Sequence, residues 1–260
     1  MNDFKNYKLN LKPDKIELDR DYKLNIINVN YLPKKAFIPI NIINDQGRYG
    51  SCTSFSLSKI LEYFSREEYK QELDVSKFFL YYNSRVADGT VFEDNGTSLK
   101  TALKTYNRNG ACINELHPYI DENFSKKPSD LAYFDGKKRY KVRYEKVSNL
   151  NEALYALASG HPLYAGIKIY DSFYETGKDG LIPINSGNMN GLHAVVFNGY
   201  ENLNNMLFNV KTKREIYGIN SWSEDWGNKG CFKFNSDMWD DLVVDCWCLI
   251  PTDILVGEST

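Results

Sequence analysis

The sequence predicts an α+β protein in which a helical lobe is followed by a lobe of antiparallel strands. Helical periodicity is concentrated in the first half of the chain, and strand-like alternation is concentrated in the second half. The chain has 260 residues, of which 42% are hydrophobic, which is enough for one large domain or for two lobes that share a core. The boundary between two such lobes is where an active site is expected.

Residues 1–40 are interpreted as an extended arm that lies over the rest of the protein. They are polar and rich in Lys and Asn, and Pro13, Pro33 and Pro39 interrupt regular structure. The first residues contain no apolar core of the kind found in signal peptides, so no signal peptide is expected.

Three helices are predicted in the first half of the chain. The first follows Ser51, where apolar residues recur with the spacing of one buried helix face. These residues are Leu57, Ile60, Leu61 and Phe64. Ser76 is expected to be the N-cap of the second helix. The third helix is expected near residues 98–109, with Gly110 as its stop.

The second half predicts one helix and then several strands. The helix is expected within residues 148–160. Apolar or alternating runs typical of strands lie at residues 163–169, 193–200, 206–210, 215–220, 231–234 and 243–250.

Charge and apolar run length exclude two classes of partner. The net charge is −2, with both signs interspersed, so no nucleic-acid partner is expected. The basic run at residues 135–146 is interpreted as the solvated edge of a strand. The longest apolar runs, such as residues 194–197, are far too short to cross a bilayer, so no membrane partner is expected.

The cysteines predict a reducing environment. The chain has five cysteines, so at least one thiol is unpaired. Cys246 and Cys248 are two residues apart in a strand-like run and should point the same way, but they do not form a zinc ligand set.

Cys52 is the first candidate for chemistry, since it follows a Gly-Ser pair at the start of a helix. Unsatisfied N–H groups and the helix dipole stabilise a thiolate at this position, so its pKa should be lowered. A cysteine without a role can also occupy a helix start, and position alone leaves that alternative open.

His193 is the second candidate among the three histidines of the chain. His117 and His161 each precede a proline and are interpreted as loop residues. His193 lies at the entry of a strongly apolar strand, where it is either a core histidine or a general base held by rigid backbone.

Asn220 is the third candidate and is expected to end a strand. An Asn side chain can accept a hydrogen bond from one imidazole nitrogen and leave the other nitrogen free. Trp222 would exclude water from that bond. The alternative is a turn in which Trp222 and Trp226 serve only as core anchors.

Three motifs together resemble the papain-like cysteine peptidases. They are "DQGRYGSCTSFS", "GLHAVVFNGY" and "INSWSEDWGNKG", which contain Gln46, Cys52, His193 and Asn220 in that order. The resemblance covers roughly residues 40 to 250 and is greatest for the short bacterial and viral members that lack a long propeptide.

The resemblance implies a papain-like two-lobed fold with an antiparallel, β-barrel-like second lobe. The helical lobe would be about residues 41–145 and the β-rich lobe about residues 146–255, with the active-site cleft between them. Residues 1–40 would be the arm and residues 256–260 a tail.

The resemblance also implies a role for each site residue. Cys52 would attack the scissile carbonyl, His193 would transfer protons, and Asn220 would orient His193. The side-chain amide of Gln46 and the backbone N–H of Cys52 would form the oxyanion hole. Gly96 and Leu192 would bind substrate together with Trp222, and no metal or organic cofactor is implied.

Three positions depart from the family pattern. Tyr49 stands where secreted members usually carry a disulfide-bonded Cys, Thr53 replaces an aromatic residue, and Ser223 replaces a Gly. Thr53 and Ser223 could alter the rate and the shape of the cleft.

The resulting interpretation is a cysteine endopeptidase that acts on polypeptides, is expected to be a monomer, and is intracellular or virion-associated. The alternatives are a catalytically silent scaffold, and an acyl transferase or amidase that uses the same site. Because 51 residues precede Cys52, residues 1 to about 30 either pack on the surface or lie partly over the cleft and limit access to it.

Overall fold

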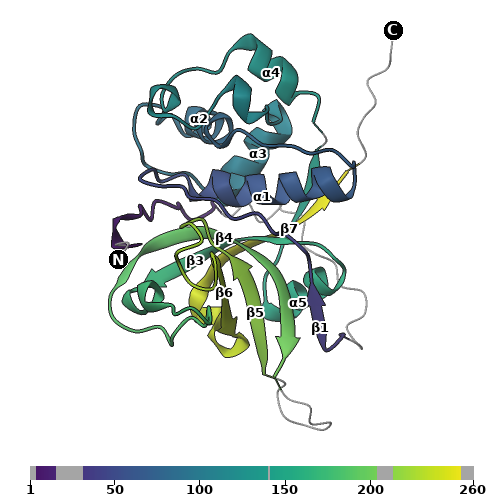
Figure 1. Ribbon diagram of the computed structural model, residues 1–260, viewed down its shortest axis with the longest axis vertical. Coiled ribbons are helices and arrows are strands. Elements are labelled where there is room, and N and C mark those ends of the chain that lie inside the picture. Colours follow the sequence, from purple (N-terminus) through teal and green to yellow (C-terminus); the bar gives the residue numbers. More distant parts are fainter. Residues whose placement is uncertain (1–3, 16–31, 140, 204–212, 253–260) are drawn as a thin grey trace.

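The computed structural model describes residues 4–15, 32–139, 141–203 and 213–252. Helices gather at one end of the molecule and a curved sheet at the other, with helix α1 along the boundary between them (Figure 1). The predicted α+β class is confirmed.

Most helices of the described residues lie before residue 140 in the sequence. The α-helices are α1 (Cys52–Glu67), α2 (Lys77–Asp88), α3 (Leu99–Asn109), α4 (Asp130–Gly136), α5 (Leu150–Ala158) and α6 (Trp239–Leu242). Short 3-10 helices are η1 (Phe4–Asn6), η2 (Asn114–Leu116), η3 (Asp121–Asn123), η4 (Asp171–Glu175) and η5 (Ser236–Met238).

The strands form one antiparallel sheet. They are β1 (Lys35–Phe37), β2 (Val142–Lys146), β3 (Leu163–Tyr170), β4 (Met189–Asn202), β5 (Arg214–Ile219), β6 (Cys231–Asn235) and β7 (Val243–Pro251). Their order is β2-β7-β3-β4-β5-β6, and β1 pairs with β4 outside this path.

Helix α1 forms where the apolar spacing predicts it and packs on both lobes. The four apolar residues that predicted it are all buried. The helix contacts α2 and α3 on one side and β4 on the other. Its first residue, Cys52, therefore lies at the boundary between the lobes.

Helix α2 begins after the predicted N-cap Ser76, and helix α3 ends before the predicted stop Gly110. The Oγ atom of Ser76 accepts a hydrogen bond from the backbone N–H of Phe79 at 3.0 Å and caps α2. Gly110 follows α3 with a φ of 71°, and a Cβ there would lie 1.7 Å from the carbonyl oxygen of Gly136. Only glycine fits this turn.

Pairing of β4 with β5 brings distant parts of the sequence together. Val196 of β4 lies opposite Ile219, the last residue of β5. His193 lies three residues before Val196, and Asn220 directly follows Ile219. Because the strands are antiparallel, His193 and Asn220 lie at the same end of the pair.

Some elements differ from the sequence-based expectations. Strand β4 begins at Met189, four residues earlier than predicted. The basic run contains β2, which pairs with β7 at the sheet edge. The strand predicted at residues 206–210 lies outside the described residues. Within the expected arm, Lys35–Phe37 form β1 and pair with β4, since Pro33 and Pro39 flank this strand without entering it.

In the part of the chain that the structure describes, no helix has the length and apolar character needed to span a membrane. All five cysteines are free, and Cys246 and Cys248 are both buried in β7.

Candidate active site

The thiol of Cys52 lies at the first turn of α1, against strand β4. Cys52 has no exposed surface. The thiol is within hydrogen-bonding reach of the backbone of Ala194, the residue that follows His193. One turn further along α1, the Oγ atom of Ser56 donates to the carbonyl oxygen of Ala194 at 2.9 Å. These contacts place Cys52 beside the part of β4 that carries His193.

His193 and Asn220 form a buried hydrogen bond. Nε2 of His193 and Oδ1 of Asn220 are 2.8 Å apart. Because Oδ1 can only accept, Nε2 carries the proton in this bond. Among the described residues, Nδ1 of His193 has no hydrogen-bond partner. The free nitrogen can therefore accept a proton.

Trp222 covers this bond. Its ring centroid lies 5.0 Å from that of His193, and its side chain is fully buried. Trp226 packs edge-on against Trp222 at 5.6 Å. The aromatic cover excludes water and strengthens the bond between imidazole and amide.

Gln46 is fixed by bonds at both ends of its side-chain amide. Oε1 accepts from the Oγ–H of Ser221 at 2.7 Å, and Nε2 donates to the carbonyl oxygen of Tyr49 at 2.9 Å. An amide nitrogen has two hydrogens, so one N–H remains after the bond to Tyr49. The backbone N–H of Gln46 also donates to the carbonyl oxygen of Ser221 at 2.9 Å.

Burial changes the pKa of both candidate proton carriers. It raises the pKa of the Cys52 thiol to about 11 and lowers the pKa of His193 to about 4. Each charged form loses its hydration in the buried site, and this burial favours the neutral forms of both groups. The lowered thiol pKa expected from the helix start is wrong here, because burial outweighs the backbone N–H groups that stabilise a thiolate.

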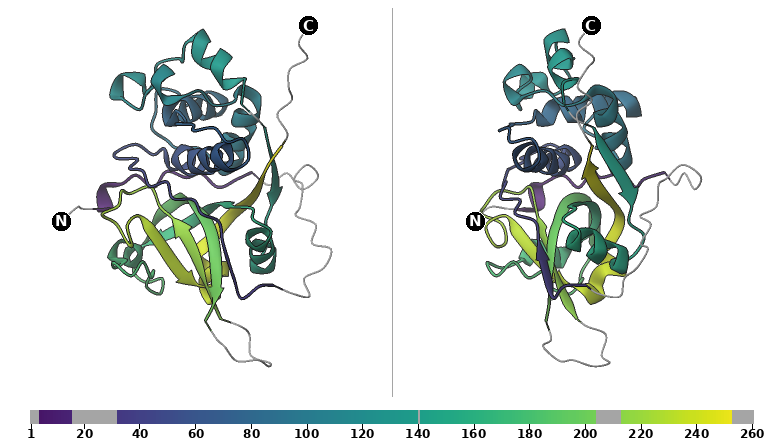
Figure 2. Two further views of the ribbon diagram at one scale, coloured as in Figure 1. Left: turned by 45° about the vertical axis from the view of Figure 1, so that its right-hand side comes forward. Right: turned by 90° about the vertical axis from the view of Figure 1, so that its right-hand side faces the viewer.

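The arm segment, defined as residues 4–15, lies between the two lobes (Figures 1 and 2). The backbone N–H of Leu11 donates to the carbonyl oxygen of Leu192 at 3.3 Å. The carbonyl oxygen of Asn10 lies so close to Gly96 that a Cβ there would be 1.7 Å from it. A Cβ on Gly50, two residues before Cys52, would lie 2.8 Å from the Cβ of Asn10.

Both ends of the arm segment are anchored. Tyr7 stacks on Trp222 at 5.2 Å, and its hydroxyl donates to Asp45 at 2.8 Å. At the other end, Asp14 accepts from the backbone N–H of Lys100 at 2.9 Å and from Nε1 of Trp247 at 2.7 Å. The residues that the arm segment contacts therefore include Gly96, Leu192 and Trp222, the three residues expected to bind substrate.

The other two histidines lie elsewhere. His117 ends η2 in the helical lobe, and burial lowers its pKa to about 4. His161 lies in the turn between α5 and β3. Both occupy the turns that the following prolines predicted, and neither joins Cys52.

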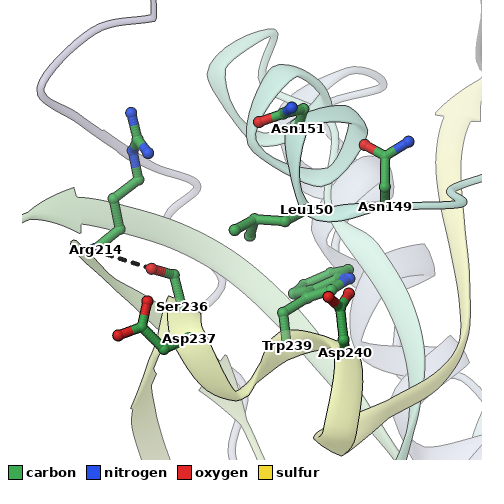
Figure 3. A pocket seen from close by; sticks show the side chains of 8 residues that line it. All are labelled: Asn149, Leu150, Asn151, Arg214, Ser236, Asp237, Trp239 and Asp240. Carbon is green, nitrogen blue, oxygen red and sulfur yellow. Dashed lines mark hydrogen bonds between the residues drawn. The ribbon is translucent and has the colours of Figure 1, made fainter. Parts of the chain in front are cut away.

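A hollow of about 660 Å³ lies away from these residues, at the start of α5, the start of β5 and the η5–α6 turn (Figure 3). Its lining is Asn149, Leu150, Asn151, Arg214, Ser236, Asp237, Trp239 and Asp240. None of these side chains is a thiol or an imidazole, so the hollow offers no nucleophile and base of the kind found at Cys52.

Two of the family departures have a visible structural setting. Tyr49 packs on Phe78 and Phe124 with ring centroids 5.2 and 4.9 Å away. Its hydroxyl donates to Asp121 at 2.7 Å. Ser223 has a φ of 64°, the left-handed conformation that favours glycine.

Sequence reasoning did not find several residues that hold the site in place. Ser221 and Tyr119 hold Gln46, since the Tyr119 hydroxyl donates to the Gln46 carbonyl oxygen at 2.8 Å. Lys59 is fully buried on α1 and donates to Oδ1 of Asn44 at 2.9 Å. A signal for Lys59 was present, because it lies seven residues after Cys52 and so on the same helix face.

Comparisons with known proteins identify the family of this chain. The papain family cysteine protease profile matches residues 31–250. An uncharacterized peptidase C1-like protein of Acanthamoeba polyphaga mimivirus is 29% identical over 223 residues, which cover 79% of this chain and 68% of that protein.

Solved structures share the fold. Xylellain, a cysteine protease from Xylella fastidiosa, is similar with a TM-score of 0.82 and 27% identity, covering 94% of this chain and 96% of that one. Digestive procathepsin L 3 of Tenebrio molitor has a TM-score of 0.70 at 16% identity, covering 94% of this chain and 76% of that one. The papain-like resemblance of the sequence is thereby confirmed, and this chain belongs to the papain family of cysteine proteases.

Proposed function

We propose that this chain is a cysteine endopeptidase that works through Cys52, His193 and Asn220. The observation that carries the proposal is the covered bond between Nε2 of His193 and Oδ1 of Asn220. That bond leaves Nδ1 as the nitrogen that can exchange a proton with the thiol of Cys52.

The reaction begins when polypeptide substrate replaces the arm segment. Nδ1 of His193 takes the proton of Cys52, and Sγ attacks the scissile carbonyl carbon. The carbonyl oxygen becomes an oxyanion, which accepts hydrogen bonds from the backbone N–H of Cys52 and from the side-chain N–H of Gln46. The imidazolium then protonates the leaving amine, and the C–N bond breaks to leave an acyl-thioester on Cys52.

Hydrolysis of the acyl-thioester completes the cycle. His193 accepts a proton from water, and the hydroxide adds to the thioester carbonyl carbon. The C–S bond then breaks, the acid product leaves, and the proton returns to the thiol. An acyl transferase or amidase would differ only in the group that accepts the acyl chain or leaves from it.

Asn220 acts through His193 in this scheme. Its Oδ1 keeps the proton on Nε2 and so holds the imidazole in the tautomer that can accept from Cys52. Gly96, Leu192 and Trp222 are proposed to bind substrate, because the arm segment occupies an extended course along the same three residues.

The test compares peptide hydrolysis by the wild-type chain and by Cys52→Ala across pH 4 to 9. Each is incubated with a thiol-directed epoxide, and the adduct is located by mass spectrometry. We expect a bell-shaped activity profile that is lost in the variant, with one adduct on Cys52. Cys112→Ala is a matched control, since Cys112 is also free and buried.

Three results would overturn the proposal. Full activity of Cys52→Ala would assign the reaction to another nucleophile. Labelling of Cys52 without peptide cleavage, together with a ligated product when an amine is added, would favour the acyl transferase alternative. A chain that neither cleaves nor labels would support the silent scaffold. The monomeric state and the intracellular or virion-associated location stay predictions.

A further inference from the structure

Lys59 is a fully buried lysine on the face of α1 that carries Cys52. It lies seven residues after Cys52, which is about two helical turns. Ser56, four residues after Cys52, lies on the same face and bonds to β4. Lys59 therefore projects from α1 toward the β-rich lobe, underneath the site.

Burial of an ammonium group is costly unless the group has a partner of its own. The other buried charge on this helix, Glu62, is paired with Lys77 at 2.9 Å. Lys59 instead bonds to a neutral amide, Oδ1 of Asn44, at 2.9 Å. Burial lowers the pKa of Lys59 to about 7, because the ammonium group loses its hydration in this position.

Asn44 opens a short segment that carries Gln46. The carbonyl oxygen of Asn44 accepts from the backbone N–H of Ser223 at 3.2 Å. Asp45 forms a bridge with Trp222, and the backbone N–H of Gln46 donates to Ser221. Segment 44–46 thus pairs with residues 221–223, which directly follow Asn220.

The two proposed oxyanion donors lie on different parts of the fold. One is the backbone N–H of Cys52 on α1, and the other is the side chain of Gln46 on segment 44–46. The hydrogen bond from Lys59 to Asn44 joins α1 directly to that segment. Tyr119 also holds this segment, since its hydroxyl donates to the Gln46 carbonyl oxygen.

From these contacts we infer that Lys59 is a positioning residue for the oxyanion hole. It ties segment 44–46 to α1 and so fixes the Gln46 side chain relative to the backbone N–H of Cys52. The inference rests on the proposed function. Lys59 acts through Asn44 and Gln46 and does not itself contact the reacting atoms.

The experiment measures kcat and KM of the full chain on a short fluorogenic peptide for Lys59→Met. Methionine keeps most of the apolar stem of the lysine side chain and removes the donor. We expect kcat to fall at least about tenfold with KM changed less than about twofold, because oxyanion contacts act mainly in the transition state. Ser58→Ala is the control, since Ser58 is equally buried on α1 but donates to the carbonyl oxygen of Phe55 in its own helix.

A second variant, Asn44→Leu, removes the acceptor and leaves Lys59 in place. If both variants act through one bond, the double variant should lose no more kcat than the more damaging single variant. If Lys59→Met does not fold, Asn44→Leu tests the inference by itself, since Asn44 is only partly buried. Asn44→Leu alone should then lower kcat with KM unchanged.

The failures are distinguishable. An active wild type with unchanged kcat in Lys59→Met or Asn44→Leu overturns this inference and leaves the proposed function intact. A fall in kcat with an equal fold-rise in KM also overturns the inference. So does a double variant whose fold-loss in kcat is the product of the two single losses. If the Cys52→Ala variant keeps the activity of the wild type, the proposed function is overturned and this inference with it.

Discussion

Ser223 shows how one residue can carry strain beside the site. Its φ of 64° places the backbone of Ser223 in the left-handed region, where residues other than glycine are disfavoured. The backbone N–H donates to Asn44, and Oγ accepts from the backbone N–H of Asp225 at 3.2 Å. These bonds hold the conformation that the family usually reaches with Gly.

The strain predicts an unusual order of stability at position 223. Ser223→Gly should be more stable than Ser223→Ala by about 1 kcal/mol, because both lose the Oγ bond and only Ala keeps the left-handed cost. Urea unfolding of the two variants measures the difference. Equal stability, or a more stable Ala variant, would show that the turn relaxes to another conformation.

Thr53, the other departure from the family pattern on which rate could depend, is buried in helix α1. Its carbonyl oxygen accepts from the Tyr164 hydroxyl at 2.9 Å, while its Oγ1 is buried without a hydrogen-bond partner among the described residues. Nothing in these contacts requires the aromatic residue usual in the family. The small side chain is accommodated within the packed face of α1.

At the scale of elements, the arm segment covers the residues that are proposed to bind substrate. Its side chains reach both lobes: Lys8 pairs with Asp94 at 2.6 Å, and Leu11 is only 5% exposed. A Cβ on Gly166 of β3 would lie 2.6 Å from Cδ2 of Leu11. Of the two placements expected from the sequence, the described part of the arm occupies the one over the site.

Loosening the arm segment should therefore raise activity. Leu11→Asp places a carboxylate in a buried position close to Asp245, and this should weaken docking of the arm. We expect kcat/KM of the full chain to rise about tenfold, which corresponds to a docking change of about 1.4 kcal/mol. Alkylation of Cys52 should accelerate in parallel.

Val86→Asp is the matched control for this charge. Val86 is a half-exposed residue of α2 and has no described contact with the arm segment. If Leu11→Asp leaves both kcat/KM and the alkylation rate at the wild-type level, the arm does not limit access to the site.

At the scale of the whole molecule, stability is linked to pH through buried histidines. Burial lowers the pKa of His117 and of His193 to about 4, and it also lowers that of His161. Each binds a proton less readily in the folded chain than in the unfolded chain. The stability they provide is complete above about pH 6.5 and is lost as the pH falls toward 4.

His117→Gln isolates this effect away from the site. The difference in the free energy of unfolding between wild type and variant should shrink by about 2 kcal/mol from pH 7 to pH 4, because glutamine does not titrate. Urea unfolding at several pH values measures it. A difference that stays constant with pH would mean that His117 takes up its proton as easily when folded as when unfolded.

Local signals explain how much of the fold and site could be predicted. Ser76 and Gly110 mark helix ends through their own backbone chemistry, and the apolar face of α1 depends only on spacing along the chain. The residue types Cys52, His193 and Asn220 could be proposed for the same reason, since each has a chemical property that its flanking residues make recognisable.

The sequence by itself thus determined the fold class, the family, and the residues worth testing. Only the tertiary structure decided that the arm segment lies on Gly96 and Leu192, that burial disfavours the charged forms of Cys52 and His193, and that Lys59 joins α1 to Asn44. The physical reason is that desolvation and contacts between distant segments depend on every element packed around a residue, and no local pattern carries that information.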